Sequence, residues 1–233
     1  MALISVAGLT KVFGSRAVLS DISFEINRNE RVGLIGPNGA GKTTLFRLLL
    51  GLLKPTQGEI IFDEQAVGKR HEHIGFCFDN DGLYGSLTAR ENMEFFQRCY
   101  RSQQSVELLL STVGLDATDG RVVSKYSLGM RKRLGLARSL LSEPTLLLLD
   151  EPLLGLDPDG QAEFIEQLRK LGTDTSILLS SHDLEAVSSL CTRVIGLSGS
   201  VVFDGSVDVL RDETSGAYAG YRKIFYQKVQ ESE

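Results

Sequence analysis

The sequence predicts an α/β fold in which central parallel strands alternate with helices. Residues 145–150 contain a continuous apolar run of the length expected for a strand that is covered on both faces of a sheet, and residues 176–180 read as a second central strand. Residues 31–35 read as a buried strand, which enters a glycine-rich loop followed by a helical pattern. Strands and helices that alternate in this way indicate a mainly parallel sheet.

The composition is that of a globular protein with a sizeable core, because 42% of the 233 residues are hydrophobic and 24% are charged. A net charge of −5 argues against broad attraction to nucleic acid, and we expect no nucleic-acid partner. Cys77, Cys99 and Cys191 form no C-x-x-C pair, so three buried, reduced thiols are expected. The sequence shows neither a signal-peptide pattern nor a membrane-length apolar run, so we expect the chain by itself to be soluble.

A small antiparallel sheet is expected from the N-terminal strands. Residues 3–6 and 22–26 alternate between apolar and polar side chains, as strands with one exposed face do. Residues 59–62 form a further strand after a helix break at residues 54–58, and residues 74–78 read as a short buried strand. These strands add a small antiparallel β subdomain to the core.

Most of the segment between residues 79 and 141 is predicted to be helical. Thr88 and Glu91 have the spacing of a capping box, a second helical pattern ends at Gly114, and a third opens around Ser127. Both ends of this segment rejoin the same sheet, so it is expected to be an inserted subdomain of a single domain, residues 1–233. The expected boundaries are about 1–78 and 142–215 for the core, 79–141 for the helical subdomain and 216–233 for a polar tail.

Two further helices and a hairpin are expected in the second half of the core. Residues 162–171 and 184–190 have helical patterns. Residues 194–197 and 201–205 have strand patterns on either side of a short turn, which predicts a hairpin.

The glycine-rich loop fits G-x-x-x-x-G-K-[ST], the P-loop pattern that binds phosphate chains. Its glycines let backbone N–H groups approach phosphate oxygens, and the helix after it directs its N-terminus to the same anion. Lys42 supplies a positive charge for the β- and γ-phosphates, and the Thr43 hydroxyl is placed to ligate Mg²⁺. The candidate nucleotide-binding residues of the loop are Asn38, Gly39, Ala40, Gly41, Lys42, Thr43 and Thr44.

An acidic pair follows the apolar run at residues 145–150. An acid at the carboxyl end of a central strand lies where α/β sheets bind ligands. Asp150 is expected to hold Mg²⁺ through a water, and Glu151 to orient or deprotonate an attacking water. The structural alternative is an acidic strand end before a turn at Pro152, and the presence of the P-loop makes that the weaker reading.

Together with three later motifs, these segments resemble the ABC-type ATPases over essentially the whole chain. The segment around Ser127 is most similar to the ATP-binding subunits of bacterial drug, antibiotic and peptide exporters. The resemblance implies a P-loop NTPase core that binds and hydrolyses ATP with Mg²⁺. The motifs that carry it are residues 36–44, 126–130, 146–151, 156–158 and 181–183.

The resemblance also implies roles for single residues. His182 would contact the γ-phosphate and help to hold Glu151, so that these two residues and Lys42 are the implied catalytic set. Asp157 stands where the family has an aspartate along its dimer interface. Phe13 stands where the family stacks an aromatic ring on adenine, but a place in the core is equally open to it.

Partners are implied in the same way. Ser127 and Gly129 of one subunit would complete the ATP site of another in a head-to-tail homodimer or heterodimer, although Ser127 alone reads as an ordinary helix N-cap. Separate transmembrane permease subunits would dock around Leu83, Tyr84 and Phe95. The expected location is cytoplasmic, peripheral on the inner face of the cell membrane.

The sequence departs from the family pattern at three places. Asp79 replaces the usual glutamine that contacts Mg²⁺ or its water; an acid can still do so, but its reach and its coupling to the membrane subunit are in doubt. Leu128 and Met130 replace a glycine and a glutamine, and Leu153 and Leu154 replace two hydroxyl residues. None of these departures touches Lys42, Asp150, Glu151 or His182, so hydrolysis is expected to survive them.

Other functions remain as alternatives. Soluble ABC ATPases act on DNA, iron–sulfur assembly or ribosomes, but the DNA-repair forms have long coiled-coil insertions and the ribosomal forms have two ATPase units. A GTPase would need an Asn-Lys-x-Asp motif, which the sequence lacks. A subunit that binds ATP without hydrolysing it is disfavoured by Glu151.

Overall fold

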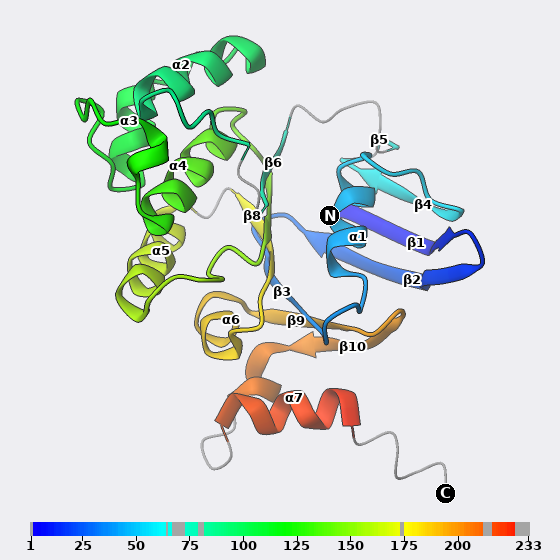
Figure 1. The fold of residues 1–233 in the computed structure, drawn as a ribbon. Coiled ribbons are helices and arrows are strands. Elements are labelled where there is room, and N and C mark those ends of the chain that lie inside the picture. The colour runs from blue at the N-terminus through cyan, green and yellow to red at the C-terminus, as the bar shows by residue number, and fades with distance from the viewer. Residues whose placement is uncertain are drawn as a thin grey trace, which may run out of the picture. The chain divides into compact units, whose positions relative to one another are not determined.

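The computed structural model describes residues 2–63, 65–66, 73–78, 82–172, 175–211 and 216–226. The chain divides into two compact units, one of residues Met1–His71 with Ser176–Glu233 and one of residues Glu72–Thr175 (Figure 1). The second unit is wider than the expected insertion at 79–141, because it also holds two strands and a further helix. The organisation as a single domain stays a prediction.

The first unit contains the predicted antiparallel sheet, whose strands are ordered β2-β1-β4-β5. It consists of β1 (Ala2–Phe13), β2 (Arg16–Asn27), β4 (Gln57–Phe62) and β5 (Gln65–Ala66). The strands β1 and β2 are much longer than the sequence indicates, since register shifts interrupt the strict alternation of side chains along the pair.

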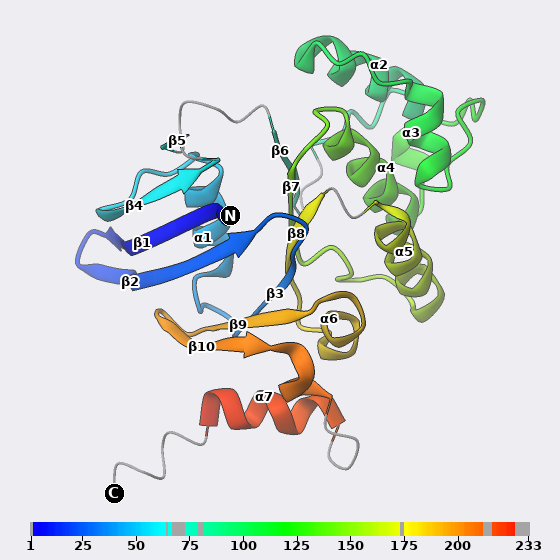
Figure 2. The same cartoon turned by 180° about the vertical axis from the view of Figure 1, so that it is seen from behind.

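A second sheet in the same unit has β3 (Arg31–Ile35) at its centre. The strand lies between β8 (Ser176–Ser180) and β9 (Arg193–Leu197), parallel to both, and β10 (Val201–Ser206) pairs antiparallel with β9 (Figure 2). All five residues of β8 are buried, as expected for a central strand that is covered on both faces. The parallel strands and the hairpin are therefore confirmed.

Helices α1 (Lys42–Leu49) and α6 (Leu184–Leu190) belong to this unit. Helix α6 packs closely on β3 because Gly33 has no side chain: a Cβ there would lie 2.4 Å from Cγ1 of Val187.

Helix α7 (Gly216–Tyr226) occupies part of the segment that the sequence describes as a weakly patterned tail. It follows the 3₁₀ turn η2 (Val207–Leu210) and lies beside β10 (Figure 1). A Cβ at Gly220 would lie 1.9 Å from the carbonyl oxygen of Val209, so the glycine permits the contact with η2.

In the second unit, β6 (Ile74–Cys77) pairs parallel with β7 (Leu146–Asp150), and every residue of β7 is buried. The other elements of the unit are α2 (Ala89–Tyr100), α3 (Val106–Thr112), η1 (Val123–Lys125), α4 (Leu128–Leu140) and α5 (Pro158–Lys170). The predicted capping box of α2 is present, with Thr88 and Glu91 bonded reciprocally. Helix α5 begins four residues earlier than expected.

Two expectations about composition can be compared with the structure. Cys77 and Cys191 are buried, but Cys99 is exposed near the end of α2, so the expectation of three buried thiols is wrong for Cys99. Within the part of the chain that the structure describes, no helix combines the length and hydrophobicity needed to cross a bilayer.

Candidate functional site

The phosphate loop leaves the carboxyl end of β3, and two of its glycines cannot be replaced without a clash. A Cβ at Gly36 would lie 2.2 Å from the carbonyl oxygen of Leu197. A Cβ at Gly41 would lie 2.5 Å from Cδ2 of Leu19, and Gly41 has a φ of 100°, which L side chains rarely adopt. The loop therefore depends on glycine for both space and conformation.

Backbone hydrogen bonds brace the loop from inside and from a neighbouring turn. The N–H of Ala40 donates to the carbonyl of Pro37 at 3.1 Å, and the N–H of Gly199 donates to the carbonyl of Ala40 at 3.1 Å. The carbonyl of Gly199 in turn accepts from the N–H of Ser20 at 2.8 Å. The turn of the β9–β10 hairpin thus links the loop to β2, which holds the loop in one conformation.

Lys42 is buried at the start of α1, with only 8% of its surface exposed. Its Nζ donates to the carbonyls of Gly36 at 2.8 Å and of Pro37 at 3.5 Å, so the ammonium is held within the loop. The first turn of α1 contains no acid that would oppose an anion at this end of the helix. Asn38, Gly39 and Thr43 are exposed, Thr44 is half-buried and Ala40 is buried.

His182 follows β8 in the same unit. Leu34 of β3 is paired with Ser180 of β8, and both strands run in the same direction, so the P-loop and His182 follow neighbouring carboxyl ends of one sheet. His182 is exposed, and the next residue, Asp183, caps α6 by accepting from the N–H of Ala186 at 2.9 Å. The histidine therefore lies on a turn that is anchored to a helix.

The structure distinguishes between the two readings of Phe13. The ring is 46% exposed at the end of β1, and Nζ of Lys11 lies 4.9 Å from its centroid. A core position for Phe13 is wrong, and an accessible ring that already contacts one cation can offer a surface for stacking.

In the second unit, Asp150 is 7% exposed at the end of β7, and Glu151 follows with a φ of 50°. A left-handed glutamate costs about 1 kcal/mol or more and persists where surrounding contacts hold it. Its carbonyl oxygen accepts two hydrogen bonds at 3.1 Å, from Nζ of Lys132 and from the N–H of Leu154. Sequence reasoning missed Lys132, although a spacing of four from the buried Leu136 places it on the inner face of α4.

Ser127 is the N-cap of α4 and accepts a hydrogen bond from the N–H of Met130 at 3.2 Å. The capping role expected as the alternative for Ser127 is thus confirmed, and Ser127 is exposed. Arg121 lies beside this helix end, with Nη2 4.0 Å from Sδ of Met130. Hydrogen bonds from Arg121 lower the pKa of Asp119 to about 2.

The residues after Glu151 form a turn that leads to α5. Asp157 is exposed and caps α5 by accepting from the N–H of Gly160 at 2.8 Å. Leu153 is 2% exposed and belongs to the core, whereas Leu154 is 54% exposed. The two substituted hydroxyl positions therefore have different environments, and only Leu154 presents an apolar side chain to solvent.

Asp79, a predicted Mg²⁺ and nucleotide contact, lies outside the described residues. The strand before it, β6, ends at Cys77, which is paired with Leu149 of β7. The first unit thus groups Phe13, the P-loop and His182, and the second groups Asp150, Glu151, Ser127, Gly129 and Asp157.

Comparisons with known proteins agree with one another. The family model described as ABC transporter matches residues 19–154. An uncharacterised ABC transporter ATP-binding protein of Bacillus subtilis, YdbJ, is 37% identical over 83% of this chain, which spans 65% of that relative's length. The lantibiotic transport ATP-binding protein SrtF of Streptococcus pyogenes is 36% identical over 92% of this chain and 93% of its own. The bacitracin transport ATP-binding protein BcrA of Bacillus licheniformis is 38% identical over 82% of this chain and 65% of its own.

Solved structures show the same fold. An ATP-binding subunit of an ABC transporter superposes with a TM-score of 0.82 at 27% identity and covers 95% of this chain and 99% of its own. The dimeric cassette MJ0796, bound to ADP and Pi after hydrolysis, superposes with a TM-score of 0.78 at 25% identity, over 88% of this chain and 98% of its own. The expected P-loop NTPase fold is therefore confirmed.

Proposed function

The chain belongs to the ABC transporter family of ATP-binding proteins, and from that premise we propose that it is the ATP-hydrolysing subunit of a membrane exporter. The observation that carries the proposal is the braced P-loop, in which Gly36 and Gly41 have no room for a side chain and Lys42 is held inside. A loop of this kind presents several N–H donors and one cation to a phosphate chain.

The residues have separate roles in this proposal. Lys42 and the N-terminus of α1 bind the phosphates, and His182 donates a hydrogen bond to the γ-phosphate. The carboxylate of Glu151 accepts the proton of the attacking water. Phe13 stacks on the adenine, which its exposed ring supports.

Magnesium is part of the proposal because the donors fit it. Thr43 offers an exposed hydroxyl and Asp150 a carboxylate, and Mg²⁺ is usually held by one or two protein oxygens with waters and substrate phosphates. The bound ion supplies charge neutralisation to the phosphates. Asp79 is a third candidate for this contact.

The transported class and the partners are inferred from the relatives. Proteins named for bacitracin, lantibiotic and daunorubicin transport or resistance support an antibiotic, drug or peptide as the exported substrate. The dimeric neighbour supports a dimer. In the proposed head-to-tail homodimer or heterodimer, Ser127 and Gly129 of one subunit complete the ATP site of the other. Asp157 would lie along the same dimer interface.

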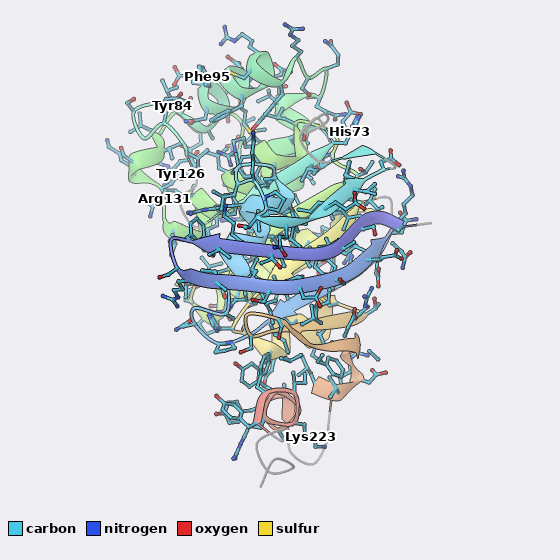
Figure 3. All side chains as sticks on the ribbon, turned by 90° about the vertical axis from the view of Figure 1, so that its right-hand side faces the viewer. His73, Tyr84, Phe95, Tyr126, Arg131 and Lys223 are labelled. Carbon is cyan, nitrogen blue, oxygen red and sulfur yellow. The ribbon has the colours of Figure 1, made fainter. Side chains whose placement is uncertain are left out.

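An exposed aromatic cluster is the proposed contact for separate permease subunits on the inner face of the membrane. Tyr84 is 46% and Phe95 is 38% exposed, and their rings meet edge to face at 4.9 Å (Figure 3). Phe96 and Tyr100 continue the cluster along α2. Leu83, the third predicted contact, is half-buried.

The test is ATP binding and turnover by the purified chain. Lys42→Ala should lower turnover at least 100-fold and weaken ATP binding, because it removes a cation aimed at the phosphates. Lys54→Ala, which changes an exposed lysine of the same unit, should behave as the parent does. Unchanged turnover in Lys42→Ala would contradict the P-loop assignment.

A further inference from the structure

We propose that Lys132 is a positioning residue, which holds the backbone of Glu151 in its left-handed conformation and links it to the start of α4. The inference rests on the proposed function, in which Glu151 takes the proton of the attacking water. Lys132 is placed by its geometry: its Nζ lies 3.1 Å from the carbonyl oxygen of Glu151. Lys132 lies outside the family motifs at residues 126–130 and 146–151.

The burial of Lys132 carries a desolvation cost that its hydrogen bonds must offset. Only 6% of Lys132 is exposed, and an ammonium leaves water at a large desolvation penalty unless hydrogen bonds compensate it. A lysine at an ordinary helix position would keep its charged end in solvent. Here the charge is directed at the carbonyl of Glu151, the one non-glycine residue after β7 that has a positive φ in the described part of the chain.

The second hydrogen bond to the same carbonyl shows what Lys132 adds. The N–H of Leu154 also donates to the oxygen of Glu151, so a turn closes without the lysine. The N–H of Leu154 holds this carbonyl from within the turn, whereas Lys132 donates to it from a separate helix. The two donors together hold the peptide plane after Glu151, and with it the ψ of the residue whose side chain is the proposed base.

Helix α4 connects this contact to the proposed dimer contact. Ser127 caps the helix, the N–H of Arg131 donates to the carbonyl of Ser127 at 3.0 Å, and Lys132 follows in the next position. A displacement of the helix start is therefore transmitted to the Nζ of Lys132 within about one and a half turns. Phosphate binding at Ser127 of one subunit would in this way adjust Glu151 of that same subunit.

The test compares steady-state ATP hydrolysis by three variants. Lys132→Met keeps the length of the side chain without a donor, and we expect kcat to fall about tenfold with KM for ATP within about twofold of the parent. Lys132→Arg keeps a cationic donor and should recover most of kcat. Lys170→Met, a change at a lysine whose side chain is 58% exposed in the same unit, is the matched control and should leave kcat unchanged.

Three outcomes would overturn the inference. One is a kcat for Lys132→Met equal to that of the parent. Another is an equal loss of kcat in Lys132→Met and Lys132→Arg. The third is a loss of kcat that accompanies a matching fall in melting temperature. Both of these results would indicate a role in packing alone. Glu151→Gln separates a failure of this inference from a failure of the proposed function. Normal ATP hydrolysis by Glu151→Gln would show that Glu151 is not the base. Loss of hydrolysis in Glu151→Gln with no effect of Lys132→Met would contradict only the positioning role of Lys132.

Discussion

The residues that carry the chemistry divide into those whose position follows from a motif and those whose position does not. Gly36 and Gly41 are predicted by the P-loop pattern, and the clashes that a Cβ would make with Leu197 and Leu19 give the atomic reason. The left-handed backbone of Glu151 and its bond to Lys132 are not predictable in this way. They depend on a turn and a helix that meet only in the folded unit.

The cysteines give a prediction at the same scale. Iodoacetamide at pH 8 should modify Cys99 in the native protein and leave Cys77 and Cys191 unmodified, as measured by mass spectrometry of peptides. Cys99 is exposed, whereas burial raises the pKa of Cys191 to about 12, so its reactive thiolate is nearly absent at pH 8. All three thiols should react after denaturation in guanidinium, and native labelling of Cys191 at the rate of Cys99 would contradict the structure.

Among the elements, buried central strands were predicted most closely, since β3 and β8 have the predicted bounds. Helix starts were predicted less accurately where a glycine interrupts the helical sequence pattern. Helix α5 begins at Pro158, after the cap Asp157, but Gly160 in its first turn obscures the pattern. Helix α7 is obscured by Gly220 in the same way, although its aromatic residues are spaced three and four apart.

The capping box of α2 allows a quantitative prediction for an element. Thr88→Ala should lower the free energy of unfolding of the unit by about 1 kcal/mol, measured by urea denaturation at pH 7, because it removes the acceptor for the N–H of Glu91. Thr112→Ala, which removes only a hydroxyl bonded to the carbonyl of Leu108 within α3, should cost less. An equal effect of the two changes would contradict a special role for the cap.

The cap also has a predictable pH dependence. The N–H and hydroxyl of Thr88 donate to the Glu91 carboxylate and lower its pKa below 4.5. A lowered pKa in the folded state contributes stability above the unfolded value and loses it as pH falls. Thr88→Ala keeps the N–H and loses only the hydroxyl's part of this lowering, so the difference in stability between parent and variant should shrink by that part as the pH falls below 4.5. A difference that grows there would contradict this sign.

For the whole molecule, the family could be read from the order of the motifs, and the family model over residues 19–154 confirms it. The motifs contain the residues expected to bind ATP, so they do not predict which substrate is transported. Substrate contacts in such systems are expected in the separate membrane subunits. The exported class therefore remains a proposal that rests on the named relatives.

The central claim is that Glu151 drives ATP hydrolysis in a dimer closed by ATP, and Glu151→Gln tests it most directly. The variant keeps the shape of the side chain and loses the proton acceptor. Binding of ATP, its turnover and the elution of the protein on a sizing column with ATP should be measured on one preparation. The account predicts retained ATP binding, at least a 100-fold loss of turnover and accumulation of dimer. Turnover equal to that of the parent, with no dimer, would contradict it.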